Sequence, residues 1–274
     1  MELAKLTIVN GTNHLFVSGN GTPSQNAAEL QAAYNAAKLM TPNGLPLSAA
    51  NRVAIIVAQA IFTFGVSKFT LNTEFIDFVS LTGNRSIFID GIVVTANDVL
   101  IVGVKCGAGI QSLTTDYSAD NRFEVASGLN KLVVKNCEGG NHSFAKQGVC
   151  SGTYYDCIGM KCSFGGGAAS GEVAVASGTF IRCTVTTDRG FGGFLANFTG
   201  VAYDCNAGGA AFGMFGICSG TAYRCIAGTD SFGDYGTLTG KLFNCVKQVG
   251  TFIPVTGGGR TYYCIDGNGA PNNQ

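Results

Sequence analysis

Apolar residues come in short runs that suit strands along most of the chain, and one early segment has the spacing of a helix. The runs include VAIIVAQ at 53–59, FIDFVSL at 75–81 and DVLIVGVKC at 98–106. In the segment 23–40, Ala27, Leu30, Tyr34 and Ala37 recur at intervals of three and four residues. This spacing puts them on one face of a helix. The pattern predicts one amphipathic helix followed by many short strands.

The predicted helix has a signal at each end. Thr22 can cap its first turn, Pro23 suits the first helical position, and Gln25 completes a capping box. The sequence TPNG at 41–44 ends it. We expect this helix to cover the open end of the strands that follow, because that end would otherwise leave backbone groups unpaired.

A motif of seven residues that ends in cysteine recurs through the second half of the chain. Successive members lie 20, 26, 22, 20, 20 and 19 residues apart, and a phenylalanine follows most of them at seven residues. A period near 20 with short β-branched and aromatic runs and frequent Gly predicts a parallel β-helix with one repeat in each coil. Stacked coils would pile these cysteines into a ladder: Cys137, Cys157, Cys183, Cys205, Cys225, Cys245 and Cys264.

The motif SGTYYDC at 151–157 also predicts which side chains face inward. Alternation of the kind found in strands puts Cys157 and Tyr155 inside and Asp156 outside. Applied to the other repeats, it predicts an inward column of Tyr155, Ile181, Tyr203, Tyr223, Phe243 and Tyr262. It also predicts an outer salt ladder of Asp156, Arg182, Asp204 and Arg224.

The cysteines fit a packing role. Cys150 and Cys218 take the place that Ala176, Phe198 and Leu238 take in other repeats. Disulfides are disfavoured because parallel Cβ vectors hold stacked residues too far apart and because the total of eleven is odd. The spacing does not fit zinc, and a thiol buried among apolar groups is inert. We expect reduced cysteines, no metal and no cofactor.

Composition narrows the class of partner. The chain of 274 residues has a net charge of zero, and only 12% of its residues are charged. Neither nucleic acid nor an anionic membrane surface would be attracted to it. The longest apolar run, VAIIVAQAIFTFGV at 53–66, is too short for membrane insertion. The beginning, MELAKLTIVNG, lacks the form of a secretory signal, so we expect synthesis in the cytoplasm.

Three stretches carry a resemblance to a known family. They are NGTPSQNAAELQAAYNAAK at 20–38, NRVAIIVAQAIFTFG at 51–65 and FIDFVSLTGNRSIFIDGIVVTANDVLIVGV at 75–104. Over about residues 20–137 the chain resembles the pectate-lyase-like superfamily, in the form found in phage tail spikes and tail fibres. The segment AQAIFTF stands where that family has a Pro-Gly-x-Tyr turn. The resemblance implies an all-β fold, a single-stranded right-handed parallel β-helix with a capping helix, in a virion tail.

We divide the chain into three parts. Residues 1–44 form the lead-in and capping helix, 45–126 the irregular early coils with a polar insertion, and 127–274 the regular coils with a short tail. After Cys264 the residues are few and polar. We therefore expect another chain or a further domain to cover the last coil, most simply another chain in a homotrimer.

Candidate chemistry is sparse. Members of the superfamily that cleave polysaccharides use acidic clusters, whose usual Asn-Thr-Asp, Asp-Asp and Gly-His-Gly patterns are absent here. Asp116, Asp120 and Glu124 of the insertion are the candidate catalytic acids, because glycoside cleavage needs paired carboxylates. The alternative is that they keep a protruding loop soluble. The candidate ligand-binding residues are Tyr117, Arg122, His142, Asp188 and Arg189.

The sequence favours a structural and adhesive function. The chain lacks Trp, and the tyrosines that can support a sugar ring are Tyr117, Tyr154, Tyr235 and Tyr263. We expect a subunit of a virion tail fibre or tail spike that binds a cell-surface polysaccharide and assembles with itself and with other virion or appendage proteins. The alternative is a polysaccharide lyase or glycoside hydrolase that uses the acids of the insertion.

Overall fold

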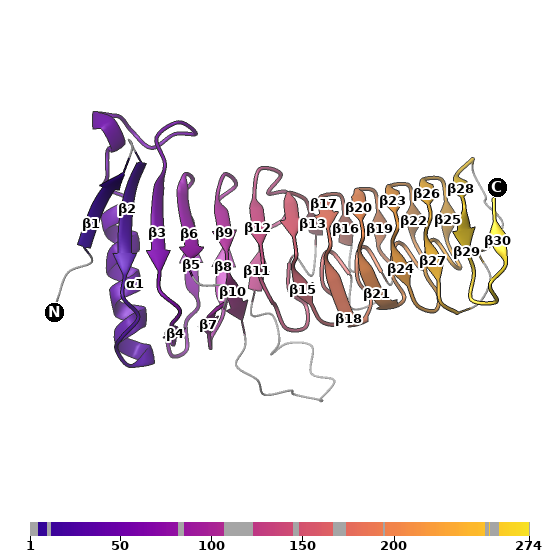
Figure 1. Cartoon of the computed structure of the whole chain (residues 1–274), viewed down its shortest axis with the longest axis horizontal. Helices are drawn as coiled ribbons and strands as arrows, with labels where there is room; N and C mark the ends of the chain where they lie inside the picture. Colours follow the sequence, from indigo (N-terminus) through magenta and orange to yellow (C-terminus); the bar gives the residue numbers. More distant parts are fainter. Residues whose placement is uncertain are drawn as a thin grey trace.

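The chain winds into a parallel β-helix, an elongated stack of coils with its one long helix at the N-terminal end (Figure 1). This arrangement confirms the predicted all-β solenoid with an N-terminal helix. The computed structural model describes residues 5–9, 12–81, 85–106, 123–144, 148–166, 174–193, 195–249, 252 and 258–273.

The longest sheet in the described residues, called the long sheet below, has twelve strands. Its first pair is antiparallel and each later strand pairs in parallel with the strand of the next coil. In spatial order the strands are β1 Lys5–Val9, β2 Thr12–Val17, β3 Val53–Val57, β6 Ile76–Ser80, β9 Leu100–Val102, β12 Val133–Lys135, β14 Thr153–Tyr155, β17 Thr179–Ile181, β20 Val201–Tyr203, β23 Thr221–Tyr223, β26 Lys241–Phe243 and β28 Arg260–Tyr262.

Two further sheets complete the regular coils. The seven-stranded sheet contains β15 Ile158–Gly159, β18 Thr184–Asp188, β21 Asn206–Gly209, β24 Ile226–Ala227, β27 Val246–Lys247, β29 Cys264–Ile265 and β30 Pro271–Asn272. The five-stranded sheet contains β13 Gly148–Cys150, β16 Ala174–Ala176, β19 Asn197–Phe198, β22 Ile217–Cys218 and β25 Thr237–Leu238. Its register aligns Cys150, Ala176, Phe198, Cys218 and Leu238, as the repeat predicts.

The early coils use two small sheets in place of these. One contains β4 Ile61–Phe62, β7 Ser86–Phe88 and β10 Val104–Cys106, and the other β5 Phe69–Leu71, β8 Ile92–Val94 and β11 Phe123–Val125.

The helix α1, Pro23–Ala37, covers the end of the solenoid as predicted, and a short 3-10 turn, Pro42–Gly44, follows it. The Thr22 side chain accepts a hydrogen bond from the Gln25 N–H, and the Gln25 side chain accepts one from the Thr22 N–H. The predicted apolar face is buried against β2, β3 and β4. The Tyr34 hydroxyl accepts N–H groups from the loop after β5, which ties the helix to the first coils.

A column of phenylalanine rings fills the regular coils. The ring centroids of Phe144 and Phe164 are 4.7 Å apart, those of Phe164 and Phe191 5.0 Å, and those of Phe212 and Phe232 4.9 Å. This spacing matches the separation of neighbouring strands, so each coil contributes one ring.

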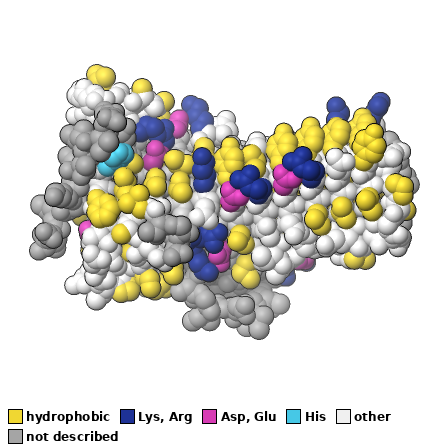
Figure 2. All heavy atoms as spheres, in the orientation of Figure 1, with side chains coloured by type: hydrophobic (Ala, Val, Ile, Leu, Met, Phe, Trp, Pro, Cys, Tyr) yellow, Lys and Arg dark blue, Asp and Glu magenta, His cyan; other side chains and the backbone are white. Residues whose placement is uncertain are grey.

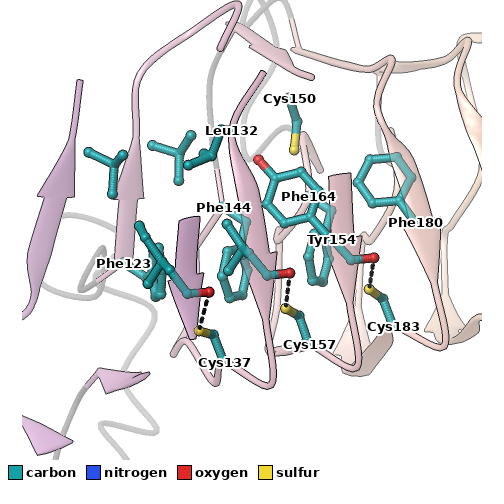
Figure 3. Packing of buried hydrophobic residues seen from close by; sticks show 14 of the residues in the cluster. Phe123, Leu132, Cys137, Phe144, Cys150, Tyr154, Cys157, Phe164, Phe180 and Cys183 are labelled. Carbon is teal, nitrogen blue, oxygen red and sulfur yellow. Dashed lines mark hydrogen bonds between the residues drawn. The ribbon is translucent and has the colours of Figure 1, made fainter. Parts of the chain in front are cut away.

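The cysteines lie inside, and none of them is joined in a disulfide. Their thiols can donate to backbone carbonyls of the preceding coil: Cys183 Sγ lies 3.4 Å from the Tyr154 carbonyl oxygen (Figure 3). Burial raises the pKa of the Cys150 thiol to about 12 and raises that of Cys157 well above its usual value. These two thiols are therefore protonated at neutral pH, which agrees with a packing role.

The predicted alternation through the cysteine is wrong. The residue before the cysteine has a left-handed backbone in each regular coil, with φ of 52° at Asp156 and 54° at Asp204. It turns the chain between the long sheet and the seven-stranded sheet, so the inward side chain is three residues before the cysteine, as at Tyr154. Tyr155 and its equivalents Ile181, Tyr203, Tyr223, Phe243 and Tyr262 therefore lie on the outer face.

Candidate functional site

Three predicted site residues, His142, Asp188 and Arg189, lie at one corner of the solenoid, where the seven-stranded sheet ends. The His142 N–H donates to the Lys161 carbonyl at 2.7 Å, and the Cys162 N–H donates to the Asp188 carbonyl at 3.0 Å. His142, Cys162 and Arg189 share a left-handed backbone, with φ between 56° and 61°. They therefore occupy equivalent positions in consecutive coils, and we call these three residues the corner file.

Few reactive side chains of the corner file are exposed to solvent. His142 is buried, and burial raises the pKa of the Cys162 thiol to about 11 although the charges of Arg189 and Lys161 oppose this shift. Arg189 Nε lies 3.4 Å from Asp188 Oδ2, and both side chains are partly exposed. A ligand at this corner would meet one carboxylate and one guanidinium, whereas acid–base cleavage of a glycoside requires two carboxyl groups.

Four predicted residues of the insertion, Asp116, Tyr117, Asp120 and Arg122, lie outside the described residues. The residues that flank this segment adjoin the coil of His142. The Cys106 N–H donates to the Glu138 carbonyl at 2.8 Å, and the Phe123 ring lies 4.6 Å from the Phe144 ring. Cys106 and Phe123 therefore lie in the coil next to that of His142.

Glu124, the remaining predicted acid, lies on β11. Its Oε1 atom is 2.5 Å from Lys68 Nζ. The Glu124 carboxylate is therefore paired with the ammonium group of Lys68. Nor do the described residues include any group of three or more His, Cys, Asp or Glu side chains arranged to hold a metal ion.

The outer face of the long sheet is a second candidate binding surface. The sequence analysis predicted that its side chains would point into the interior. We call Tyr155, Ile181, Tyr203, Tyr223, Phe243 and Tyr262 the aromatic file. Neighbouring ring centroids from Tyr203 to Tyr262 are 4.7–4.9 Å apart, with interplanar angles of 5–8°. Each inner ring is covered on its faces by its neighbours and turns its edge outward.

Two ion pairs lie beside the aromatic file. Arg182 donates two hydrogen bonds to Asp156 at 2.7 and 2.8 Å, and Arg224 donates two to Asp204 at 2.6 and 2.8 Å. These bonds lower the pKa of both carboxyl groups. Figure 2 shows such acidic and basic pairs next to a row of apolar side chains. The prediction that these charges face outward is confirmed, as two separate pairs.

One sequence signal could have revealed this surface. The position before the cysteine holds Asn136, Asp156, Asp204 and Asn244 in four coils. Asn and Asp are the residues other than Gly that most readily adopt a left-handed backbone. A recurring Asn or Asp there indicates a corner, and a corner breaks the alternation.

The tyrosines proposed as sugar platforms have different outcomes. Tyr154 is fully buried, so its assignment as a platform is wrong. Tyr235 and Tyr263 are exposed, and one face of Tyr235 stacks on Phe215 with centroids 5.2 Å apart. Tyr117 lies outside the described residues.

Comparisons with known proteins identify no relative. No family model matches the chain, and neither a curated protein nor a solved structure matches it. Among the described helices, none has the length and apolar character needed to cross a membrane. The structure thus defines the class of fold of this protein, a parallel β-helix.

Proposed function

We propose that this protein is a structural and adhesive β-helix, a subunit of a virion tail fibre or tail spike, that binds a cell-surface glycan along the outer face of the long sheet. The aromatic file carries this proposal. It presents ring edges and phenol groups at the repeat distance of the coils, beside guanidinium–carboxylate pairs. Rings with one apolar and one polar end suit a ligand that is itself partly apolar and rich in hydroxyls.

The proposed setting also rests on the shape of the fold. A stack of coils forms a rod whose outer faces repeat along its axis, and a polysaccharide repeats its units in the same way. The chain is made in the cytoplasm with reduced cysteines, assembles as a homotrimer, and joins other tail proteins in the virion.

Binding to purified bacterial surface polysaccharides tests this function. The double variant Tyr203→Ser, Tyr223→Ser removes two stacked rings from the aromatic file and should weaken binding at least tenfold. The matched control is the double variant Ile226→Ser, Ile265→Ser, which removes two exposed apolar side chains from the seven-stranded sheet. Equal affinity of the tyrosine double variant and the unmodified chain, with both folded by circular dichroism, would refute the proposed binding face.

A second function, polysaccharide lyase or glycoside hydrolase, is favoured by one observation. The described residues on either side of the segment that holds Asp116 and Asp120, Cys106 and Phe123, lie in the coil next to that of His142, and Asp188 and Arg189 lie two coils beyond His142. Incubating the same polysaccharides with the protein and assaying new reducing ends or unsaturated products tests this. Turnover that is lost in both Asp116→Asn and Asp120→Asn would establish the enzyme, and no turnover on any glycan that binds would exclude it.

A further inference from the structure

The interior of the last coils holds an ion pair between Lys247 and Asp234. Lys247 is 2% exposed and Asp234 is 5% exposed, so this is the least exposed of the ion pairs among the described residues. Lysine and aspartate are almost never buried to this extent unless they are paired. Phe232, two residues before Asp234, contacts Phe252 at the end of the phenylalanine column, and the Asp230 carboxylate and the Ser231 backbone also act on Asp234.

Both residues depart from the repeat at positions that are apolar one coil earlier. The register of β24 and β27 places Lys247 directly over Ala227, which itself lies over Ala207. Asp234 takes the place of Met214, as the stacking of the next residues, Phe215 and Tyr235, shows. Two polar side chains thus replace two apolar ones in the same stretch, and they contact each other.

A buried ion pair is energetically unfavourable compared with the apolar side chains of the preceding coil. Removing two charges from water costs several kcal/mol per ion, and their mutual attraction only partly offsets the cost. Burial raises the pKa of Asp234 even though Lys247 donates a hydrogen bond to it. Proton transfer from the ammonium to the carboxylate would remove both charges and leave a neutral amine against a neutral carboxylic acid.

We propose that Lys247 and Asp234 are joined by an isopeptide bond that the folded chain forms without another enzyme. The Lys247 Nζ lone pair attacks Asp234 Cγ, so that a new C–N bond forms and one Cγ–O bond breaks. The departing oxygen leaves as water with one proton from the acid and one from the amine. The chain is neither oxidised nor reduced, and no co-reactant is needed.

The folded chain supplies what this reaction needs. Holding two reacting groups together raises their effective concentration to about 10⁵ M or more in well-oriented cases. Both side chains are almost fully buried, and this burial limits hydrolysis of the new bond by bulk water. The resulting amide is uncharged, so that it fits the apolar interior better than the ion pair does.

Mass spectrometry of the denatured, purified chain tests the proposal. We expect an intact mass lower than that of the linear chain by one water molecule. Trypsin should fail to cleave after Lys247, and the segment 242–260 should appear linked to the segment 225–241, which contains Asp234. The ion pair Lys68–Glu124, which is partly exposed, is the internal control and should give unlinked peptides.

Three variants locate the bond. Asp234→Asn should still form it with loss of ammonia instead of water. Lys247→Ala should show no loss, as should the double variant Asp234→Met, Lys247→Ala, which restores the residues of the preceding coil and so preserves packing. Unlinked tryptic peptides from the unmodified chain would overturn the proposal, and so would a water loss that persists in Lys247→Ala and maps to other residues.

Discussion

The early coils and the regular coils reach the same solenoid with different interiors. In the early coils, Phe88 contacts Phe62, Phe69 and Phe78 in a mixture of stacked and edge-to-face arrangements. In the regular coils, the rings from Phe144 onward stack one above another. The first interior is an irregular cluster, whereas the second is a column in which each coil repeats its neighbour.

The two regions also differ in how charge is used. In the early coils, Arg52 binds Asp77 at 2.6 Å and Asp98 at 2.7 Å, linking the strands β3 and β6 to the turn before β9. In the regular coils, apart from the buried pair Lys247–Asp234, ion pairs such as Asp204–Arg224 lie on the surface. Individual interactions that are not repeated in other coils therefore stabilise the early coils. The regular coils depend mainly on repeated contacts between neighbouring coils.

The largest expected effect comes from a ring in the column. Phe164→Ala should lower the free energy of unfolding by about 3–5 kcal/mol, because it leaves a cavity between two stacked rings. Urea unfolding measures the total, and amide hydrogen exchange measures where protection falls.

The comparison predicts where that loss occurs. In Phe164→Ala, exchange should accelerate mainly in the coils that adjoin residue 164, whereas Phe88→Ala should accelerate exchange throughout the early coils. A uniform loss of protection along the whole solenoid in both variants would show that the two regions unfold as one unit.

The next effect in size concerns the early charge network. Arg52→Met should destabilise the chain by about 2–3 kcal/mol, less than the 3–5 kcal/mol of a fully buried pair because Arg52 is partly exposed. The substitution leaves Asp77, which is largely buried, without its cation. Arg85→Met is the control, since its partner Glu138 keeps Lys105 at 2.9 Å. Urea unfolding that shows equal losses for the two variants would contradict this account.

The regular coils could be predicted from sequence because each coil repeats the same marker. Cysteine and phenylalanine spacing indicated the stacking, and the place shared by Cys150 and Cys218 indicated the register. The sequence could not predict which side chains form the outer face. Alternation of inward and outward side chains assumes an extended backbone, and the left-handed residue Asp156 interrupts that backbone. The hydrophobic pattern also cannot show that Lys247 and Asp234 meet, since they are distant in sequence and each alone reads as a surface residue.

The packing of the early coils could not be predicted from the sequence for a different reason. Their interior combines one pair of rings in register, Phe62 and Phe88, with rings such as Phe69 and Phe78 that lie at other places in their coils. A position shared by only two neighbouring coils is too short a repeat to reveal a period. The helix was predictable even so, because Thr22 and Gln25 form a local capping box that does not depend on the rest of the fold.

A smaller effect is expected in the cysteine ladder. Cys205→Val should destabilise the chain by about 1–3 kcal/mol, because an added methyl group overfills a narrow column whose neighbours repeat the same shape. Cys205→Ser should cost about 1 kcal/mol, since a hydroxyl can use the carbonyls of Phe180 and Tyr203 that the thiol now contacts. Urea midpoints compare the two, and a Val variant as stable as the unmodified chain would show that the column tolerates larger side chains.

The smallest effect concerns the surface pair Asp204–Arg224. Asp204→Asn keeps a residue that accepts a left-handed backbone and removes the charge, so it isolates the ion pair from the corner. The hydrogen bonds from Arg224 lower the pKa of the folded carboxyl below its unfolded value of about 3.9, so the pair stabilises the fold above that pH. This contribution is lost as the pH falls through the folded pKa. The stability difference between the unmodified chain and Asp204→Asn should therefore be small at pH 7, shrink further in high salt, and vanish in acid. Thermal unfolding at several pH values measures it, and a difference that grows as the pH falls would mean that the carboxylate is strained in the folded chain and gains no stabilisation from its partner.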